Sequence, residues 1–190
     1  LKDKDLVYAC WLTRKEASST LNAPHNHISQ NASLRVNDQE LKNRKSLGLT
    51  PAWRLNIKNC LKYINSQKEK IYWEDIKQGK NLLNLDQFGD VIIARKDILT
   101  SYHLSVTVDD NSDGVTHIIR GNDLESYTNI HRLLQVLLNL RETKWFHHKL
   151  VKDTNGKRIA KRSNSKLTIK ELRKNGYSAK EVIKLAKSST

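Results

Sequence analysis

A β-branched run that leads through a glycine into a long apolar helix pattern most limits what this chain can fold into. The stretch "GVTHIIRGNDLES" (114–126) contains the run, a tight Arg-Gly-Asn-Asp turn and the start of the helix pattern at Leu124. The apolar residues that recur at helical spacing are Ile130, Leu133, Leu134, Leu137 and Leu138. A strand, a turn and a helix with one apolar face indicate an α/β fold. Ligands of open α/β folds bind at the carboxyl ends of strands, so Arg120 and Asp123 are candidates for a ligand pocket.

The chain divides into three stretches that differ in composition and hydrophobic pattern: 1–89, 90–151 and 152–190. The first is polar and rich in Asn, Lys and Ser, with a loop-like segment at 22–33. The second holds the strong patterns, including "DVIIARK" as a buried strand and "YHLSVTVDD", whose β-branched residues are also strand-like. We therefore expect the α/β core in the second stretch.

The third stretch combines a basic loop with two helix starts. "KDTNGKRIAKRSNSK" is broken by Gly, Asn and Ser, and capping boxes follow at Thr168 with Glu171 and at Ser178 with Glu181. An Asn-Gly helix stop lies between the boxes. We expect these caps to be structural.

The net charge of the chain favours a polyanionic partner. The sequence has 34 Lys and Arg against 20 Asp and Glu, a formal charge of +14, and cationic proteins release counterions when they neutralise phosphates. Nucleic acid is the first candidate, and the alternative is a basic protein that binds no polyanion.

Cysteine usage and hydropathy indicate in which cellular compartment the protein is expected. Two cysteines cannot build a disulfide framework, and no apolar run approaches the roughly 18 residues that span a bilayer. We expect a reduced, cytoplasmic protein with no membrane partner. The chain starts at Leu1 and contains no methionine, so we also expect a piece of a longer protein.

Five ordered blocks of sequence carry a resemblance to a known family. They are "FGDVIIARKD", "TSYHLSVTVDD", "GVTHIIRGNDL", "HRLLQVLLNL" and "GKRIAKR". In this order and spacing they closely resemble the catalytic domain of glutamyl-tRNA synthetases, which are class I aminoacyl-tRNA synthetases. The resemblance is closer to their shortened branch, the glutamyl-queuosine tRNA(Asp) synthetases. It covers residues 6–16 and 51–190, and residues 17–50 match poorly.

The resemblance implies a fold and a domain organisation. The expected fold is α/β, the second half of a Rossmann-like class I synthetase catalytic domain with an inserted acceptor-end subdomain. Residues 1–89 would be part of that subdomain, 90–151 the second half of the core, and 152–190 the phosphate-binding signature loop with C-terminal helices. The resemblance also implies that much of "YHLSVTVDD" is a short helix, against its strand-like pattern.

The activity implied by the resemblance is ATP-dependent activation of glutamate to glutamyl-adenylate and its transfer to queuosine of tRNA(Asp). ATP with Mg²⁺, glutamate and tRNA(Asp) would be the partners of a monomer. Only about thirty residues follow "GKRIAKR", which favours the shortened branch over a glutamyl-tRNA synthetase fragment that charges tRNA(Glu). The first class I signature, His-Ile-Gly-His, does not occur in the 190 residues. We therefore expect the chain alone to be inactive, and an inert tRNA-binding remnant is a further alternative.

Two residues align with the glutamate site of the family. They are Tyr102 and Arg120, and the chemistry agrees, because a guanidinium binds a carboxylate through paired hydrogen bonds and a phenol can orient the ligand. The alternative for Arg120 is a surface arginine at a strand end.

Four residues align with the ATP site. Lys161, in the second class I signature loop, would be catalytic, because its charge would stabilise the ATP phosphates in the transition state. The backbone of Leu150 and Val151 would recognise adenine, and Asp123 would make a structural or ribose-side contact.

Several positions depart from the family pattern. Ala160 stands where the signature loop has serine, and Leu99, Asn129 and Lys149 stand where relatives often have proline, so we expect looser turns there. The largest departure is the absence of the first class I signature, and the zinc motif is also incomplete.

We predict no zinc site. Cys10 lacks the second cysteine of the family's Cys-x-Cys motif, Cys60 lies far along the chain, and a site with His25 and His27 would lack a fourth ligand. The adjacent His147 and His148 would point apart on a strand, so we predict no metal there either.

Overall fold

The computed structural model describes residues 1–13, 16, 36–152, 156, 159 and 168–188. The predicted loop at 22–33 with its two histidines, and Ala160 and Lys161 of the signature loop, lie outside the described residues. The described elements are β1 (Val7–Cys10), α2 (Asp38–Ser46), β2 (Ala52–Leu55), α3 (Ile57–Ser66), β3 (Tyr72–Asp75), β4 (Gly79–Leu82), β5 (Ile92–Ala94), α4 (Tyr102–Ser112), β6 (His117–Gly121), η1 (Asn122–Leu124), α5 (Thr128–Leu137), β7 (Lys144–His148), α6 (Ile169–Lys174) and α7 (Ala179–Ser188).

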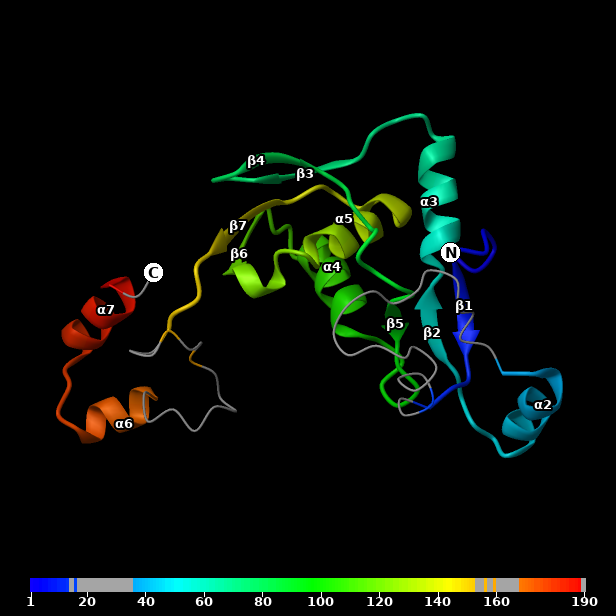
Figure 1. The fold of residues 1–190 in the computed structure, drawn as a ribbon, viewed down its shortest axis with the longest axis horizontal. Helices are drawn as coiled ribbons and strands as arrows, with labels where there is room; N and C mark the ends of the chain where they lie inside the picture. Colours follow the sequence, from blue (N-terminus) through cyan, green and yellow to red (C-terminus); the bar gives the residue numbers. More distant parts are fainter. Residues whose placement is uncertain (14–15, 17–35, 153–155, 157–158, 160–167, 189–190) are drawn as a thin grey trace.

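Two sheets are formed by strands that are distant in sequence. One sheet is antiparallel with the order β1-β2-β5, and the other has the order β4-β3-β7-β6, in which β3 and β6 both run parallel to β7. Helices α4 and α5 lie between the sheets (Figure 1); α4 contacts β5, and α5 contacts β3. Each sheet therefore contains strands from both sides of the expected boundary at residue 89, and the division into subdomains stays a prediction.

The β6–α5–β7 segment forms a parallel βαβ unit. The predicted strand is confirmed as β6, and its register with β7 pairs Arg120 with His147 and Gly121 with His148. The predicted helix start at Leu124 is wrong, because α5 begins at Thr128. Between β6 and α5 the chain makes a 3₁₀ turn and further i→i+3 hydrogen bonds, such as the one from the Thr128 N–H to the Glu125 carbonyl. The first turns lack the apolar stripe, so no packing favours α-helical bonding before Thr128.

The segment "YHLSVTVDD" is a helix. Its strand-like reading was wrong, and the helix implied by the family resemblance is confirmed as α4. Thr107 is buried on the inner side of the helix while Val108 is exposed. Packing against α5 therefore overrides the β propensity of the branched residues.

The predicted apolar stripe of α5 lies in a hydrophobic core shared by much of the chain. Ile130, Leu133 and Leu134 are fully buried. They pack with Leu55 and Ile57, from β2 and the first turn of α3. The strand predicted from "DVIIARK" is confirmed as β5 and contributes Ile93 to the same core. The core therefore fixes α5 and, through it, the end of β6.

The two C-terminal helices lie apart from the sheets (Figure 1). The predicted caps are confirmed: the Thr168 side chain accepts the Glu171 N–H, and Ser178 and Glu181 bond each other reciprocally. Helix α6 has no buried residue. Among the described residues, no helix has the length and apolar character needed to cross a membrane.

Candidate functional site

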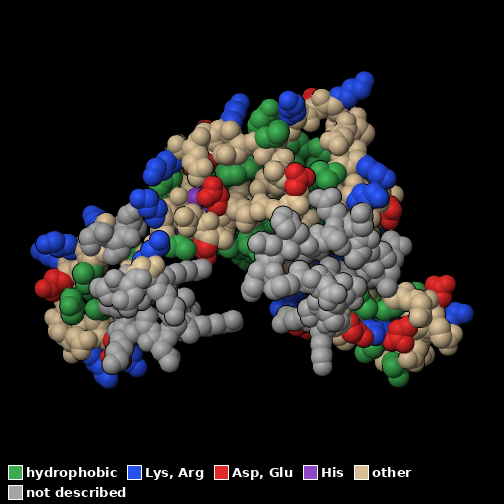
Figure 2. Space-filling view, viewed as in Figure 1, with side chains coloured by type: hydrophobic (Ala, Val, Ile, Leu, Met, Phe, Trp, Pro, Cys, Tyr) green, Lys and Arg blue, Asp and Glu red, His purple; other side chains and the backbone are tan. Residues whose placement is uncertain are grey.

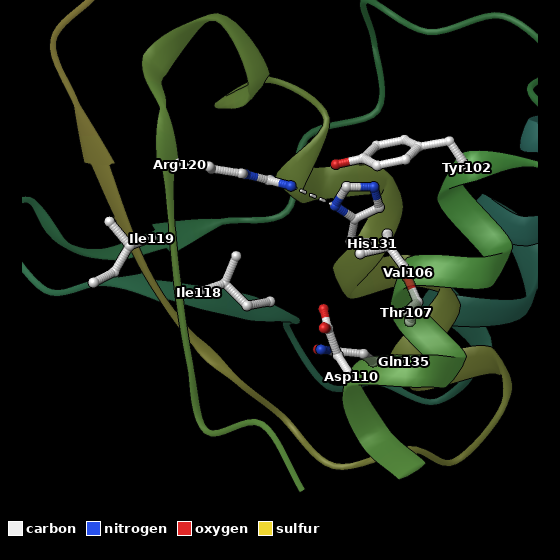
Figure 3. Close-up of a pocket in the computed structure, with 9 residues that line it drawn as sticks. All are labelled: Tyr102, Val106, Thr107, Asp110, Ile118, Ile119, Arg120, His131 and Gln135. Carbon is white, nitrogen blue, oxygen red and sulfur yellow. Dashed lines mark hydrogen bonds between the residues drawn. The ribbon is translucent and has the colours of Figure 1, made fainter. Parts of the chain in front are cut away.

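A pocket of about 170 Å³ lies between α4, α5 and β6, at the carboxyl end of β6 (Figure 3). Its lining residues are Tyr102, Val106, Thr107, Asp110, Ile118, Ile119, Arg120, His131 and Gln135. The two residues predicted for the glutamate site, Tyr102 and Arg120, are thus brought together. Apolar side chains form part of the wall, and charged groups lie at its ends, as in small-ligand sites.

All three guanidinium nitrogens of Arg120 donate hydrogen bonds within the protein. Nε donates to Nε2 of His147 at 3.2 Å, and Nη1 bonds Nδ1 of His131 at 2.9 Å. Nη2 donates to Oγ1 of Thr128 at 2.5 Å. Burial is the main cause that lowers the pKa of Arg120, but an arginine keeps its charge in proteins. Arg120 is therefore a fixed, half-buried cation rather than a surface arginine.

His147 connects Arg120 to a buried carboxylate. Its Nδ1 lies 2.8 Å from Oδ2 of Asp75, and both side chains are buried. Asp75 also accepts the backbone N–H groups of Lys77 and Gln78. Burial acts to raise the pKa of Asp75, but the hydrogen bonds from His147 and these N–H groups outweigh it, and the pKa lies below its usual value. His148 is exposed on the opposite face of β7, as predicted for adjacent strand residues.

His131 forms the second support of Arg120. Its Nδ1 bonds the guanidinium, and its Nε2 lies 3.0 Å from Nδ1 of His103. Burial, with the nearby Arg120 charge, lowers the pKa of His131 to about 3. The pKa of His103 is also lowered, again chiefly by burial. Both histidines are therefore neutral at physiological pH.

Tyr102 and Asp110 lie on the other sides of the pocket. The Tyr102 ring packs edge-on against His131, and its hydroxyl points toward the Arg120 guanidinium (Figure 3). The Asp110 carboxylate lies near Gln135 at the far end of the pocket (Figure 3). Burial raises the pKa of Asp110, and the Arg120 charge opposes that rise. A cation and an anion thus face one small cavity.

Two residues predicted for the ATP site converge beside Gly121. A Cβ at this position would lie 2.5 Å from Oδ1 of Asp123 and 2.8 Å from Cδ2 of Leu150. The backbone of Gly121 is extended, with φ −67°, so the missing side chain, and not an unusual φ, is what the position requires. Val151 follows Leu150 directly. Lys161 lies outside the described residues, so its position beside this group stays a prediction.

The sequence analysis did not predict that five residues support Arg120, either directly or through one hydrogen-bonded neighbour. Among the described residues no group of three or more His, Cys, Asp or Glu side chains is arranged to hold a metal ion. The histidines act instead as hydrogen-bond partners. The missed residues are Asp75, His103, Thr128, His131 and His147.

Comparison with solved structures agrees with the Rossmann-like α/β fold. Glutamate tRNA ligase from Elizabethkingia meningosepticum CCUG26117, solved with its amino acid, matches 91% of this chain and 34% of its own, with a TM-score of 0.61 and 21% identity. Glutamate-tRNA synthetase from Elizabethkingia anophelis matches 93% of this chain and 35% of its own, with a TM-score of 0.63 and 19% identity.

Sequence comparison identifies the family. Residues 11–187 match the catalytic domain of the class I tRNA synthetases (E and Q), and the chain belongs to this family. Glutamyl-Q tRNA(Asp) synthetase of Rhodobacter capsulatus is 46% identical over 97 residues, which are 51% of this chain and 34% of the relative. Glutamate–tRNA ligase 2 of Bartonella tribocorum is 30% identical over 182 residues, 93% of this chain and 40% of the relative. The chain thus spans about a third to two fifths of these relatives, and the expected family is confirmed.

Proposed function

We propose that the chain is the part of a glutamyl-queuosine tRNA(Asp) synthetase that binds glutamate for activation by ATP and transfer to tRNA. The observation that carries the proposal is the Arg120 guanidinium, held at three nitrogens in a pocket of about 170 Å³. Three of its five N–H groups are donated to the protein. One N–H on each terminal nitrogen therefore remains for a ligand carboxylate or the Tyr102 hydroxyl, and the side-chain carboxylate of glutamate is the proposed ligand.

ATP is the proposed co-substrate, with Mg²⁺ bound through its phosphates. Asp123, Leu150 and Val151 are proposed to contact the nucleotide, which is supported by the convergence of Asp123 and Leu150 beside Gly121. Lys161 is proposed to stabilise negative charge that develops on the phosphates when the glutamate carboxylate attacks the α-phosphorus and pyrophosphate leaves. The product of that step is glutamyl-adenylate. Its glutamyl group is then transferred to a hydroxyl of the RNA, and AMP leaves.

The choice of RNA rests on two relatives that differ in their identity to this chain and in how much of it they cover. The Rhodobacter capsulatus relative, a glutamyl-Q tRNA(Asp) synthetase, has the higher identity but covers only half of this chain. The Bartonella tribocorum relative, a glutamate–tRNA ligase, covers nearly all of it at lower identity. We favour queuosine of tRNA(Asp), with charging of tRNA(Glu) as the second candidate. The formal charge of +14 suits either RNA.

The test is glutamylation by the complete gene product that contains this chain. Radiolabelled glutamate should be transferred in the presence of ATP to tRNA(Asp) that carries queuosine, and not to tRNA(Asp) that lacks it. Transfer to tRNA(Glu) would favour the second candidate. Binding of tRNA without any transfer, and without glutamate-dependent ATP–pyrophosphate exchange, would leave only the inert tRNA-binding remnant.

A further inference from the structure

We propose that His131 and His147 are positioning residues, which hold the Arg120 guanidinium in one orientation while leaving its charge available to the ligand. The inference rests on the proposed function only in naming glutamate as that ligand. The arrangement of protons that it requires belongs to the protein itself and can be measured without any ligand.

The hydrogen-bond chemistry of arginine fixes the tautomers of both histidines. A guanidinium only donates, so each histidine nitrogen that it bonds must be an unprotonated acceptor. On His147 this nitrogen is Nε2, so Nδ1 carries the proton and donates it to Asp75 at 2.8 Å. On His131 it is Nδ1, so Nε2 carries the proton.

The same reasoning extends to the neighbouring groups. Nε2–H of His131 donates to Nδ1 of His103 at 3.0 Å, which makes that nitrogen an acceptor. The Thr128 hydroxyl oxygen accepts from Arg120 and lies 3.0 Å from Nε2 of His147. Its own O–H is therefore directed at His147. The single lone pair on Nε2 of His147 is thus shared between the Arg120 N–H and the Thr128 O–H. Rotating the guanidinium would break its three hydrogen bonds, to His147, His131 and Thr128.

Neutral partners have a different consequence for binding than carboxylates would have. Among the described residues no salt bridge joins Arg120 to an acidic side chain. Asp75 acts one step away, through His147, and the carboxylates of Asp110 and Asp123 act on the guanidinium through their charges. The positive charge is therefore oriented but not neutralised, which is what a site for a carboxylate requires.

The first experiment is nitrogen-15 NMR of the histidine side chains in the 190-residue chain without ligand. From the hydrogen bonds we expect His147 to carry its proton at Nδ1 and not at Nε2, and His131 to carry its proton at Nε2 and not at Nδ1. A charged imidazolium at either position, or the opposite tautomer, would overturn the inference, whatever the chain binds.

The second experiment measures glutamate dependence in the complete gene product. His131→Leu removes the acceptor and should raise the KM for glutamate by about 10-fold, the usual effect of one hydrogen bond to a charged group, while the KM for ATP stays unchanged. His131→Asn keeps an amide oxygen near the position of Nδ1 and should recover most of that loss. His148→Ala, on the exposed face of β7, is the matched control and should change neither value.

The outcomes separate this inference from the proposed function. If Arg120→Ala weakens glutamate but His131→Leu does not, the positioning role is wrong and the carboxylate site stands. If neither variant changes the glutamate dependence, the carboxylate site itself is wrong. If His131→Leu does not fold, the NMR result still decides, and a large rise in the KM for glutamate in His131→Asn would also overturn the inference.

Discussion

Arg120 is a charge surrounded by neutral hydrogen-bond partners, and its removal tests the site most directly. In the complete gene product, Arg120→Ala should raise the KM for glutamate by about 10- to 100-fold, because a hydrogen bond to a charged group contributes about 1.5–3 kcal/mol. Tyr102→Phe should have a smaller effect, since the ring that packs on His131 remains. Glutamate-dependent ATP–pyrophosphate exchange measures both. An unchanged KM in Arg120→Ala would contradict the assignment.

Leu99 gives a second prediction at the scale of one residue. Its φ is 55° and its N–H donates to the Arg95 carbonyl. Proline fixes φ near −65° and has no N–H, so the expectation that proline would pre-set this turn is wrong. Leu99→Pro should lower the free energy of unfolding by about 3 kcal/mol, whereas Leu99→Gly should leave it unchanged or raise it slightly. Denaturation by urea measures both, and equal stability of the two variants would argue against this backbone geometry.

The residues that face the proposed ligand could be predicted from the sequence, whereas the residues that support Arg120 from behind could not. Tyr102 and Arg120 lie in ordered blocks whose family resemblance could be recognised. Asp75 lies 72 positions from His147, and His103 lies 28 positions from His131. Contacts at such separations depend on how the sheets and helices assemble, which no local pattern contains.

At the scale of elements, Asp75 links the carboxyl ends of the parallel strands β3 and β7. It accepts the His147 backbone N–H as well as Nδ1–H of the same residue. Asp75→Asn should therefore lower the free energy of unfolding at neutral pH by about 1–3 kcal/mol, because one buried donor loses its charged acceptor. Asp109→Asn, on the exposed side of α4, is the matched control.

The same carboxylate predicts a pH dependence. The pKa of Asp75 is lower in the folded protein than its ordinary value, so its stabilisation is complete above about pH 4 and is lost as the pH falls through the folded pKa. As the pH falls below about 4, the wild-type protein should lose more stability than Asp75→Asn. Unfolding by urea at several pH values tests this, and parallel curves for the two proteins would contradict it.

Elements were predictable where pattern and packing agree. The β-branched run of β6 and the apolar stripe of α5 were both recognised from their patterns, and the stripe is buried as its helical spacing requires. Helix α4 was misread from its β-branched residues, and only the family resemblance indicated a helix. The start of α5 was placed too early because a 3₁₀ turn leaves no periodic signal in the sequence.

At the scale of the whole molecule, the charge predicts how RNA binding responds to salt. Lys and Arg side chains are distributed over the visible face, with acidic side chains between them (Figure 2). With a formal charge of +14, we expect affinity for tRNA(Asp) to fall steeply between about 50 and 200 mM salt, with little discrimination among tRNAs. Filter binding at these concentrations measures it, and an affinity independent of salt would contradict a phosphate-dominated interface.

The arrangement of the strands in the two sheets could not be predicted from the sequence. Strand β2 pairs with β1 and β5, and β3 pairs with β7 across about seventy positions. The division expected at residue 89 follows the change in composition. Each sheet contains strands from both sides of that position, and one apolar core includes residues from both stretches.

The lack of space at Gly121 has a consequence for which substitutions the protein tolerates. Gly114 has φ 72° and nothing within 4 Å of an added Cβ, so asparagine, which accepts that conformation, should be tolerated there. At Gly121 the backbone would accept any residue, but alanine already meets Asp123 and Leu150. In a saturation library, replacements at position 121 should therefore be accepted only when the Asp123 and Leu150 side chains can move aside, whereas those at position 114 should depend on φ. Two glycines of one chain would thus be retained for opposite reasons.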